Sequence, residues 1–407
     1  MSSNNWEEKK LNEIYDFASG LSKGRDEFGF GYPFLSYSEI YDNYFMPDNL
    51  ASLVNSTDKE RDRCSIKRGD VFLTRTSEVA DELGISCVAL RDYPNATFNG
   101  FTKRLRPKAN CGVLPEYAGY FFRSNHFRNQ INSLASLTTR ASLNNGMLEI
   151  LKIIIPPIKI QESITAILLT LDAKINLNKL VVNKLDYITQ TIYKSWFIDF
   201  EMSKDNEFIE SEYGIIPKGW RIISLSEIMK YAGGSQPPAS EFVNQYKDGY
   251  VRFIQIRDFV SDAHITYIPI SNRNKLCDEY DILIARYGAS LGRICYGLSG
   301  AYNVALAKVI PIKEYYSEFL RSYLSSKVFY IGINDKGGRS AQAGFNQGDI
   351  DSFKLAFPNE DSLVEKFNDI ATKLYSYRLE LLKQNRVIIQ IRDSILPKLI
   401  SGEIKVT

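Results

Sequence analysis

Two long segments of the chain repeat apolar residues every three or four positions, and no other feature constrains the fold as strongly. The segments fall within residues 158–200 and 359–405. A seam that recurs every 3.5 residues is typical of a helix that packs lengthwise against another helix. At 1.5 Å rise per residue, a helix of about 36 residues would be a rod about 54 Å long.

Most seam positions are apolar in both segments. In the first segment they are Ile164, Leu168, Leu171, Ile175, Asn178, Val182, Leu185, Thr189, Ile192 and Trp196. In the second they are Phe367, Ile370, Leu374, Tyr377, Leu381, Gln384, Ile388, Ile391, Ile395 and Lys398. The simplest partner for each helix is the other one, in an antiparallel coiled coil with a pseudo-twofold axis.

Two polar residues, Asn178 and Gln384, interrupt the seam near the middle of the two helices. A lone polar residue at such a position fixes the register in many coiled coils. We therefore expect Asn178 and Gln384 to lie close together and to set the register. The alternative, in which both side chains face solvent, stays open at this point.

The sequence also contains an internal repeat. "GDVFLTR" (69–75) matches "YDILIAR" (280–286), and "LNNGMLEILKIIIP" (143–156) matches "FNQGDIDSFKLAFP" (345–358). Trp6 stands at the start of the first copy as Trp220 does at the start of the second. An ordered series of matches along the whole chain predicts a duplicated domain rather than chance similarity.

Each copy has the same layout, a mixed region followed by one long helix. The mixed regions alternate short β-rich runs with Gly, Pro and Asn turns and helix-like pieces, which predicts α+β globular domains. The expected organisation is a first domain at 1–157, a helix at 158–200, a linker at 201–213, a second domain at 214–358 and a helix at 359–405.

Composition fits a chain that stays in the cytoplasm. No apolar run reaches the roughly 18 residues of a membrane span, and the first residues lack the apolar core of a signal peptide. The five cysteines are scattered without a C-x-x-C pair, so we expect reduced thiols and no metal cluster. A net charge of +2 does not by itself mark a nucleic-acid binder.

Two copies of one domain held apart by a rigid rod suit a target with two sites at fixed spacing. Duplex DNA is such a target, because half-sites recur every helical turn of about 34–36 Å. Since the two copies differ in detail, their half-sites should differ in sequence.

The order of features resembles the specificity subunit of type I restriction-modification enzymes over essentially the whole chain. The segments that carry the resemblance are "PPIKIQESI", "KSWFIDFE", "GIIPKGWRIISLSEI" and "ILPKLISGEIKV". The resemblance implies two target recognition domains that alternate with two helical regions. It also implies that each domain reads one part of a bipartite, asymmetric site and that the helices set the unread spacer.

The resemblance implies partners that do the chemistry. Two modification subunits would use S-adenosylmethionine to methylate adenine, and motor-nuclease subunits would use ATP and Mg²⁺ for restriction. No catalytic centre, cofactor or metal is expected on this chain. In agreement, neither Pro-Pro pair has the flanks of an adenine methyltransferase motif, no P-loop sequence is present, and there are only two histidines.

Several polar residues are candidates for contacts with DNA, because Arg and Lys read guanine, Asn and Gln read adenine, and cations hold phosphates. The candidates are Arg75, Thr76, Lys103, Arg104, Arg140, Gln255, Arg257, Arg286, Tyr287 and Arg339. Arg75 and Arg286 occupy equivalent places after a predicted strand, and a structural ion pair inside each domain is the competing explanation. Gln255 and Arg257 are expected on the same face of one strand.

Trp196 and Phe197, at the end of the first helix, either cap the coiled coil or help to dock a methyltransferase subunit. Because the basic and acidic residues are nearly balanced, a second function stays open: a duplicated coiled-coil scaffold that binds protein instead of DNA. A stand-alone enzyme is a weaker rival, since the catalytic motifs named above are missing.

Overall fold

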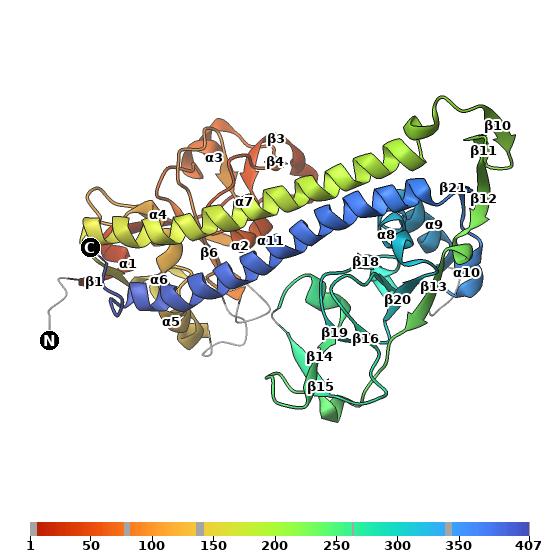
Figure 1. Cartoon of the computed structure of the whole chain (residues 1–407). Coiled ribbons are helices and arrows are strands. Elements are labelled where there is room, and N and C mark those ends of the chain that lie inside the picture. The colour runs from red at the N-terminus through yellow and green to blue at the C-terminus, as the bar shows by residue number, and fades with distance from the viewer. Residues whose placement is uncertain (1–5, 77–81, 136–141, 263, 338–343, 407) are drawn as a thin grey trace. The chain divides into compact units, whose positions relative to one another are not determined.

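The structure, a computed structural model, describes residues 6–76, 82–135, 142–262, 264–337 and 344–406. The chain forms two compact units, which are described separately. Unit 1 combines residues 1–176 with 385–407, and unit 2 covers residues 177–384. Both boundaries fall inside the two longest helices, α7 (Ile158–Phe197) and α11 (Ser362–Ile400), so each unit holds part of both (Figure 1).

Two sheets form the globular region of unit 1. The larger has the order β2 (Tyr15–Ser19), β8 (Thr102–Pro107), β5 (Val71–Thr74), β6 (Ser86–Val88), and the smaller β4 (Ser52–Val54), β3 (Phe28–Leu35), β7 (Thr97–Phe98). The helices are α1 (Leu11–Ile14), α2 (Tyr37–Asp42), α3 (Asp58–Arg63), α4 (Pro115–Phe121), α5 (Asn125–Ala135) and α6 (Asn145–Ile150). β1 (Glu7–Lys10) pairs with β9 (Lys152–Ile155), the strand that precedes α7.

Unit 2 repeats this arrangement, with one more strand in its second sheet. Its larger sheet has the order β13 (Met229–Gly233), β20 (Leu306–Pro311), β17 (Leu283–Ala285), β18 (Ile294–Cys295). Its second sheet has the order β15 (Thr266–Pro269), β14 (Tyr250–Ile254), β19 (Gly300–Tyr302), β16 (Leu276–Cys277). β12 (Trp220–Ser224) pairs with β21 (Lys354–Pro358), and the helices are α8 (Ser317–Leu324), α9 (Lys327–Gly337) and α10 (Gln347–Asp351).

The short helix before each closing strand is capped in the same way. The Asn144 side chain accepts a hydrogen bond from the Met147 amide over 2.9 Å, at the start of α6. The Asn346 side chain accepts one from the Asp349 amide over 3.2 Å, at the start of α10. Asn is a favoured N-cap because its oxygen satisfies an amide that lacks a partner in the helix.

Each unit has an apolar core that extends onto its helix segments. In unit 1, Ile164 and Leu168 of α7 and Leu399 of α11 share one cluster with the sheet residues Val71 and Leu105. In unit 2 the corresponding cluster joins Tyr193 and Phe197 of α7 to Phe367 of α11. Burial of these side chains is the main force that fixes each globular region on its helices.

The two long helices contact each other within each unit. In unit 1 the Asn385 side chain donates to the Ile175 carbonyl over 3.2 Å. In unit 2, Val182 and Leu185 of α7 form a small buried cluster with Leu381 of α11. Residue numbers rise on one helix as they fall on the other, so the segments run in opposite directions inside each unit.

The segment 201–213, expected as a linker, contains regular structure. A 3-10 turn, η3 (Glu201–Ser203), is followed by β10 (Phe208–Ser211), which forms a hairpin with β11 (Gly214–Pro217). The tight turn depends on Gly214, whose φ of 108° lies in the region that favours glycine. The sequence prediction missed this strand because its four residues, "FIES", show too little alternation to identify it.

Candidate nucleic-acid interface

Arg75 and Arg286 have equivalent backbone hydrogen bonds in the two units, and we call this shared arrangement the frame. The Arg75 amide donates to the Phe101 carbonyl over 2.7 Å, and the Arg286 amide donates to the Ala305 carbonyl over 2.8 Å. The next residue in each case forms an isolated bridge: Thr76 pairs with Ser142, and Tyr287 pairs with Gly344. The repeat in the sequence therefore corresponds to a repeat in three dimensions at this position.

In each unit, a glycine lies where two backbone segments approach closely. A Cβ atom on Gly20 would lie 2.0 Å from the Asn99 carbonyl oxygen, and one on Gly234 would lie 2.1 Å from that of Asn303. Sequence reasoning missed these two glycines and asparagines. Comparison of "FASGLS" (17–22) with "YAGGSQ" (231–236) would have found the glycines.

The guanidinium groups of Arg75 and Arg286 have donors to spare. Their Nε atoms are buried and have no hydrogen-bond partner among the described residues. Arg286 also stacks near aromatic rings, with its Cζ 5.1 Å from the ring centre of Tyr287 and 5.8 Å from that of Phe345. A buried donor without a partner is costly, but the Nε atoms of Arg104 and Arg252 share this state, so it does not by itself mark a DNA contact.

The competing explanation for this pair, a structural ion pair, finds no support in the described residues. The equivalent aspartates of the two repeats bind other cations: Asp70 pairs with Arg106 over 2.6 Å, and Asp281 pairs with Lys308 over 2.6 Å. Within the described ranges, neither Arg75 nor Arg286 forms a salt bridge.

Lys103 lies beside Arg75 and is held by neutral groups. Its Nζ donates to Ser19 Oγ over 3.0 Å and to Asn145 Oδ1 over 2.9 Å, and the residue is only 7% exposed. Burial, and then the charge of Arg75, lowers the pKa of Lys103 below the usual value for lysine. No described carboxylate pairs with Lys103, and a buried cation with a perturbed pKa is a candidate for a functional site.

Arg104, the neighbour of Lys103 on β8, has a structural role in this fold. Its Nη1 donates to the Ser65 carbonyl over 2.6 Å, and its Cζ lies 5.4 Å from the ring centre of Phe98. Successive side chains of a strand point to opposite faces of the sheet, which separates Arg104 from Lys103. The structure therefore does not bring these two candidates together.

Gln255 and Arg257 do not share one face of a strand, and that expectation is wrong. β14 ends at Ile254, and residues Ile256–Phe259 form the 3-10 turn η6, with Gln255 at its N-cap. The Asp258 carboxylate accepts from the Gln255 amide over 2.9 Å, and this bond turns the chain. Arg257 is exposed on that turn. Arg140 and Arg339, two further candidates, lie outside the described residues.

On the helices, Asn178 Nδ2 lies 3.5 Å from Gln384 Oε1, both inside unit 2. Phe197 is 2% exposed and packs against Phe319 with ring centres 4.9 Å apart, so it belongs to the core. Trp196 is half-buried, and its ring lies 6.1 Å from that of Phe367. These contacts favour packing over partner docking for both residues.

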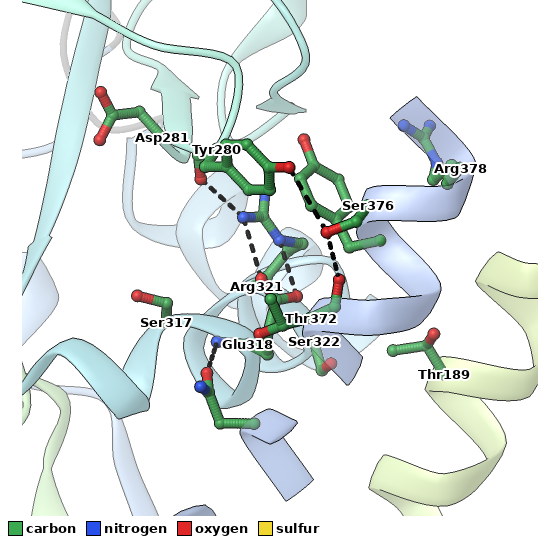
Figure 2. Close-up of polar contacts among 12 residues, drawn as sticks. Thr189, Tyr280, Asp281, Ser317, Glu318, Arg321, Ser322, Thr372, Ser376 and Arg378 are labelled. Carbon is green, nitrogen blue, oxygen red and sulfur yellow. Dashed lines mark hydrogen bonds and ion pairs between the residues drawn. The ribbon is translucent and has the colours of Figure 1, made fainter. Parts of the chain in front are cut away.

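A buried polar network joins the globular region of unit 2 to its helix segments (Figure 2). Arg321 of α8 forms an ion pair with Glu318 over 3.0 Å and donates to the Tyr280 carbonyl over 2.7 Å. Tyr375 of α11 lies under the guanidinium, 3.8 Å from its Cζ to the ring centre, and its hydroxyl donates to the Glu279 carbonyl. These bonds connect the residues just before β17, which ends one residue before Arg286, to α8 and α11.

Two further features are absent from the described residues. No helix found there combines the length and apolar character that crossing a bilayer requires. No group of three or more His, Cys, Asp or Glu side chains in that part of the chain is placed to hold a metal ion.

Comparison with known proteins agrees with the duplicated architecture. The family described as type I restriction modification DNA specificity domain matches the chain twice, at residues 3–187 and 217–389. The type I restriction enzyme MjaIX specificity subunit of Methanocaldococcus jannaschii is 25% identical over 98% of this chain and 94% of its own length. The HindI specificity subunit of Haemophilus influenzae is 22% identical over 98% and 99%, respectively.

A solved structure shares the fold. The S subunit of a type I restriction-modification system from M. genitalium superposes with a TM-score of 0.58 at 14% identity, covering 100% of this chain and 98% of that one. With two family matches over most of the sequence, the chain belongs to the family of type I restriction-modification specificity subunits and carries two copies of its DNA specificity domain.

Proposed function

We propose that this chain reads a bipartite, asymmetric DNA site, one half with each recognition domain, for a type I restriction-modification complex in the cytoplasm. The recognition domains are residues 1–157 and 214–358. The helical regions 158–200 and 359–405 form an antiparallel coiled coil with a pseudo-twofold axis and set the length of the unread spacer.

One observation carries the proposal: the two units present different side chains on the same frame around Arg75 and Arg286. The differing equivalent pairs are Ser19 and Gly233, Thr76 and Tyr287, Phe101 and Ala305, and Lys103 and Ala307. Base edges are distinguished by the hydrogen bonds and shape of the side chains that meet them. A shared frame with different side chains therefore suits two half-sites of different sequence.

The helix contacts support the measuring role of the coiled coil. Asn178 and Gln384 lie near the middle of the two helices, 206 residues apart in the chain. A polar pair at this point would oppose sliding of one helix along the other. A fixed register would in turn fix the distance between the half-sites.

A second surface supports partner binding. Leu177, Leu180, Tyr187 and Ile188 of α7 are 55%, 63%, 67% and 43% exposed, respectively, within unit 2. Their spacing places them along one side of the helix. Large apolar side chains gathered in this way mark interaction sites, so we infer that a modification subunit docks here and not on Phe197.

The chemistry is assigned to the partners. Two modification subunits would bring S-adenosylmethionine, and motor-nuclease subunits would bring ATP and Mg²⁺. This chain would contribute DNA binding and subunit placement without a reaction of its own.

Mobility shift of duplex DNA tests the proposal. The chain together with its modification subunits should retain DNA that carries the target in preference to a scrambled duplex, and mapping of methylated adenine in cells with the intact system supplies that target. If no duplex is retained at low salt, the chain is the protein-binding scaffold instead.

A further inference from the structure

Phe101 presents a large apolar ring to solvent beside Arg75. Its side chain is 66% exposed, and no other phenylalanine of the described residues is as exposed. The Phe101 carbonyl accepts the hydrogen bond from the Arg75 amide, over 2.7 Å, that defines the frame in unit 1. Single exposed apolar side chains are common on proteins, so the surroundings of the ring decide whether it has a function.

The backbone that carries Phe101 is fixed by the side chain of Asn99. Asn99 Oδ1 accepts hydrogen bonds from the Phe101 amide and from the Thr102 hydroxyl, each over 2.9 Å, and Asn99 is only 6% exposed. Asn99 Nδ2 donates to the Leu35 carbonyl over 3.3 Å, which ties the turn to β3. Because this backbone is already ordered, a contact made by the ring loses less conformational entropy on binding.

Two cations accompany the ring on one face of the larger sheet of unit 1. β5 and β8 pair with Leu73 opposite Lys103, and the same register, continued by two residues, places Arg75 opposite Phe101. Residues two apart on a strand lie on the same face, and so do residues opposite each other on paired strands. Arg75, Phe101 and Lys103 therefore share one face, on which Lys103 also bonds to Ser19 of β2.

Unit 2 has the same turn without the ring. Asn303 Oδ1 accepts a hydrogen bond from the Ala305 amide over 2.6 Å, as Asn99 Oδ1 does from the Phe101 amide. The turn is therefore part of the repeated frame, whereas the ring occurs only in unit 1. A side chain that differs on a repeated support is expected where the two half-sites differ in sequence.

We propose that Phe101 reads a thymine in the half-site of unit 1 through apolar contact with the 5-methyl group of that base. The inference rests on the function proposed above. A phenyl ring cannot match the donors and acceptors of the base edges, and the thymine methyl is the distinctive apolar group in the major groove. Arg75 and Lys103 lie on the same face and are suited to the phosphates or guanine oxygens near such a methyl group.

Removal of single methyl groups from the DNA tests this inference. The complex of the chain with its modification subunits is titrated with duplexes in which each thymine of the mapped target is replaced in turn by deoxyuridine, which lacks only the 5-methyl group. We expect one replacement to weaken binding by about 3- to 5-fold, the effect of removing one methyl group from an apolar contact. In F101A the same replacement should have no effect, because the ring that contacts the methyl group is gone.

Two further variants complete the experiment. F101L keeps an apolar side chain and should retain part of the dependence on the methyl group. F208A is the matched control, since it removes an exposed phenylalanine that lies between Glu207 and Glu210 in the sequence, and it should retain the dependence in full. Melting temperatures of the variants establish that each one is folded.

The outcomes separate this inference from the proposed function. The inference is overturned if the complex binds the target but no deoxyuridine replacement weakens binding. It is also overturned if F101A weakens binding to the thymine and deoxyuridine duplexes equally, as insertion of the ring between base pairs would. Failure of the unmodified complex to retain any duplex would instead contradict the proposed function.

Discussion

Asn178 Nδ2 lies 3.5 Å from Gln384 Oε1 in the contact between α7 and α11, and Asn178 is only 1% exposed. Such a polar pair contributes less stability than apolar residues would at the same place, and it disfavours other registers. We expect N178L combined with Q384L to raise the melting temperature and to loosen the register. Spin labels on exposed α7 and α11 positions of unit 2 would show a broader distance distribution in the double variant. A single narrow distance, equal to that of the unmodified chain, would contradict a register role.

Lys103 offers a test that separates binding from stability. K103M removes a buried cation whose pKa is lowered by burial and by Arg75, and it also removes the bonds from Lys103 to Ser19 and Asn145. Because the two effects oppose each other, the free energy of unfolding should change little. DNA affinity should fall by about 1–3 kcal/mol if Lys103 contacts DNA. Thermal denaturation and titration of labelled duplex measure the two effects. As a control, R104M should destabilise the fold, because Arg104 bonds to the Ser65 carbonyl. Loss of stability without loss of affinity in K103M would assign Lys103 a structural role.

Arg286 should contribute to the half-site read by unit 2. We expect R286A to weaken binding by about 1–3 kcal/mol and to relax the preference at one base pair if the guanidinium contacts a base. Binding to a panel of duplexes with single substitutions measures this. R221A, which removes an exposed arginine of the same unit that pairs with Glu227, is the matched control and should leave binding unchanged. A uniform loss across the panel with a shallower salt dependence would make Arg286 a phosphate contact, and unchanged binding would remove it from the interface.

The sequence predicted the large features of this fold because they are encoded by periodicity. Heptad counting brought Asn178 and Gln384 together, but it also put Ile370, Tyr377 and Ile391 on the seam of α11, where they are 38%, 52% and 45% exposed. Matching strands placed Arg75 and Arg286 at equivalent positions, since a repeat in sequence becomes a repeat in structure. Those arguments need only the order of residues along the chain.

The details of the site depend on contacts that periodicity does not encode. Lys103 and Arg104 are adjacent, and only the orientation of β8 decides which one bonds to Ser65 and which to Asn145. Arg257 does not lie on the predicted strand, because the Asp258 carboxylate accepts a hydrogen bond from the Gln255 amide and this bond starts a turn. Both outcomes follow from hydrogen bonds between residues whose contact cannot be read from apolar spacing.

Removing the cation of the buried ion pair in Figure 2 should cause a large loss of stability. R321M leaves the Glu318 carboxylate, which is 3% exposed, without its cation, and should cost about 3–5 kcal/mol of unfolding free energy. Urea denaturation followed by circular dichroism measures this. K218A, which removes one side of the exposed pair between Lys218 and Glu207, is the control and should change stability by less than about 1 kcal/mol. Similar effects of the two substitutions would show that Arg321 does not anchor the globular region on α11.

Glu60 predicts how unit 1 responds to acid. Hydrogen bonds from the Thr57 amide and then from Lys23 lower the pKa of Glu60 from 4.5 to about 2, which outweighs the opposing effect of burial. Because the folded pKa is below the unfolded one, the carboxylate stabilises the fold above about pH 4.5, and this contribution is lost as the pH falls toward 2. E60Q should therefore lower stability near neutral pH and reduce the loss between pH 4.5 and 2. Unfolding of the full chain at several pH values, with NMR titration of the Glu60 carboxyl, would detect both effects, and an ordinary Glu60 pKa near 4.5 would overturn the prediction.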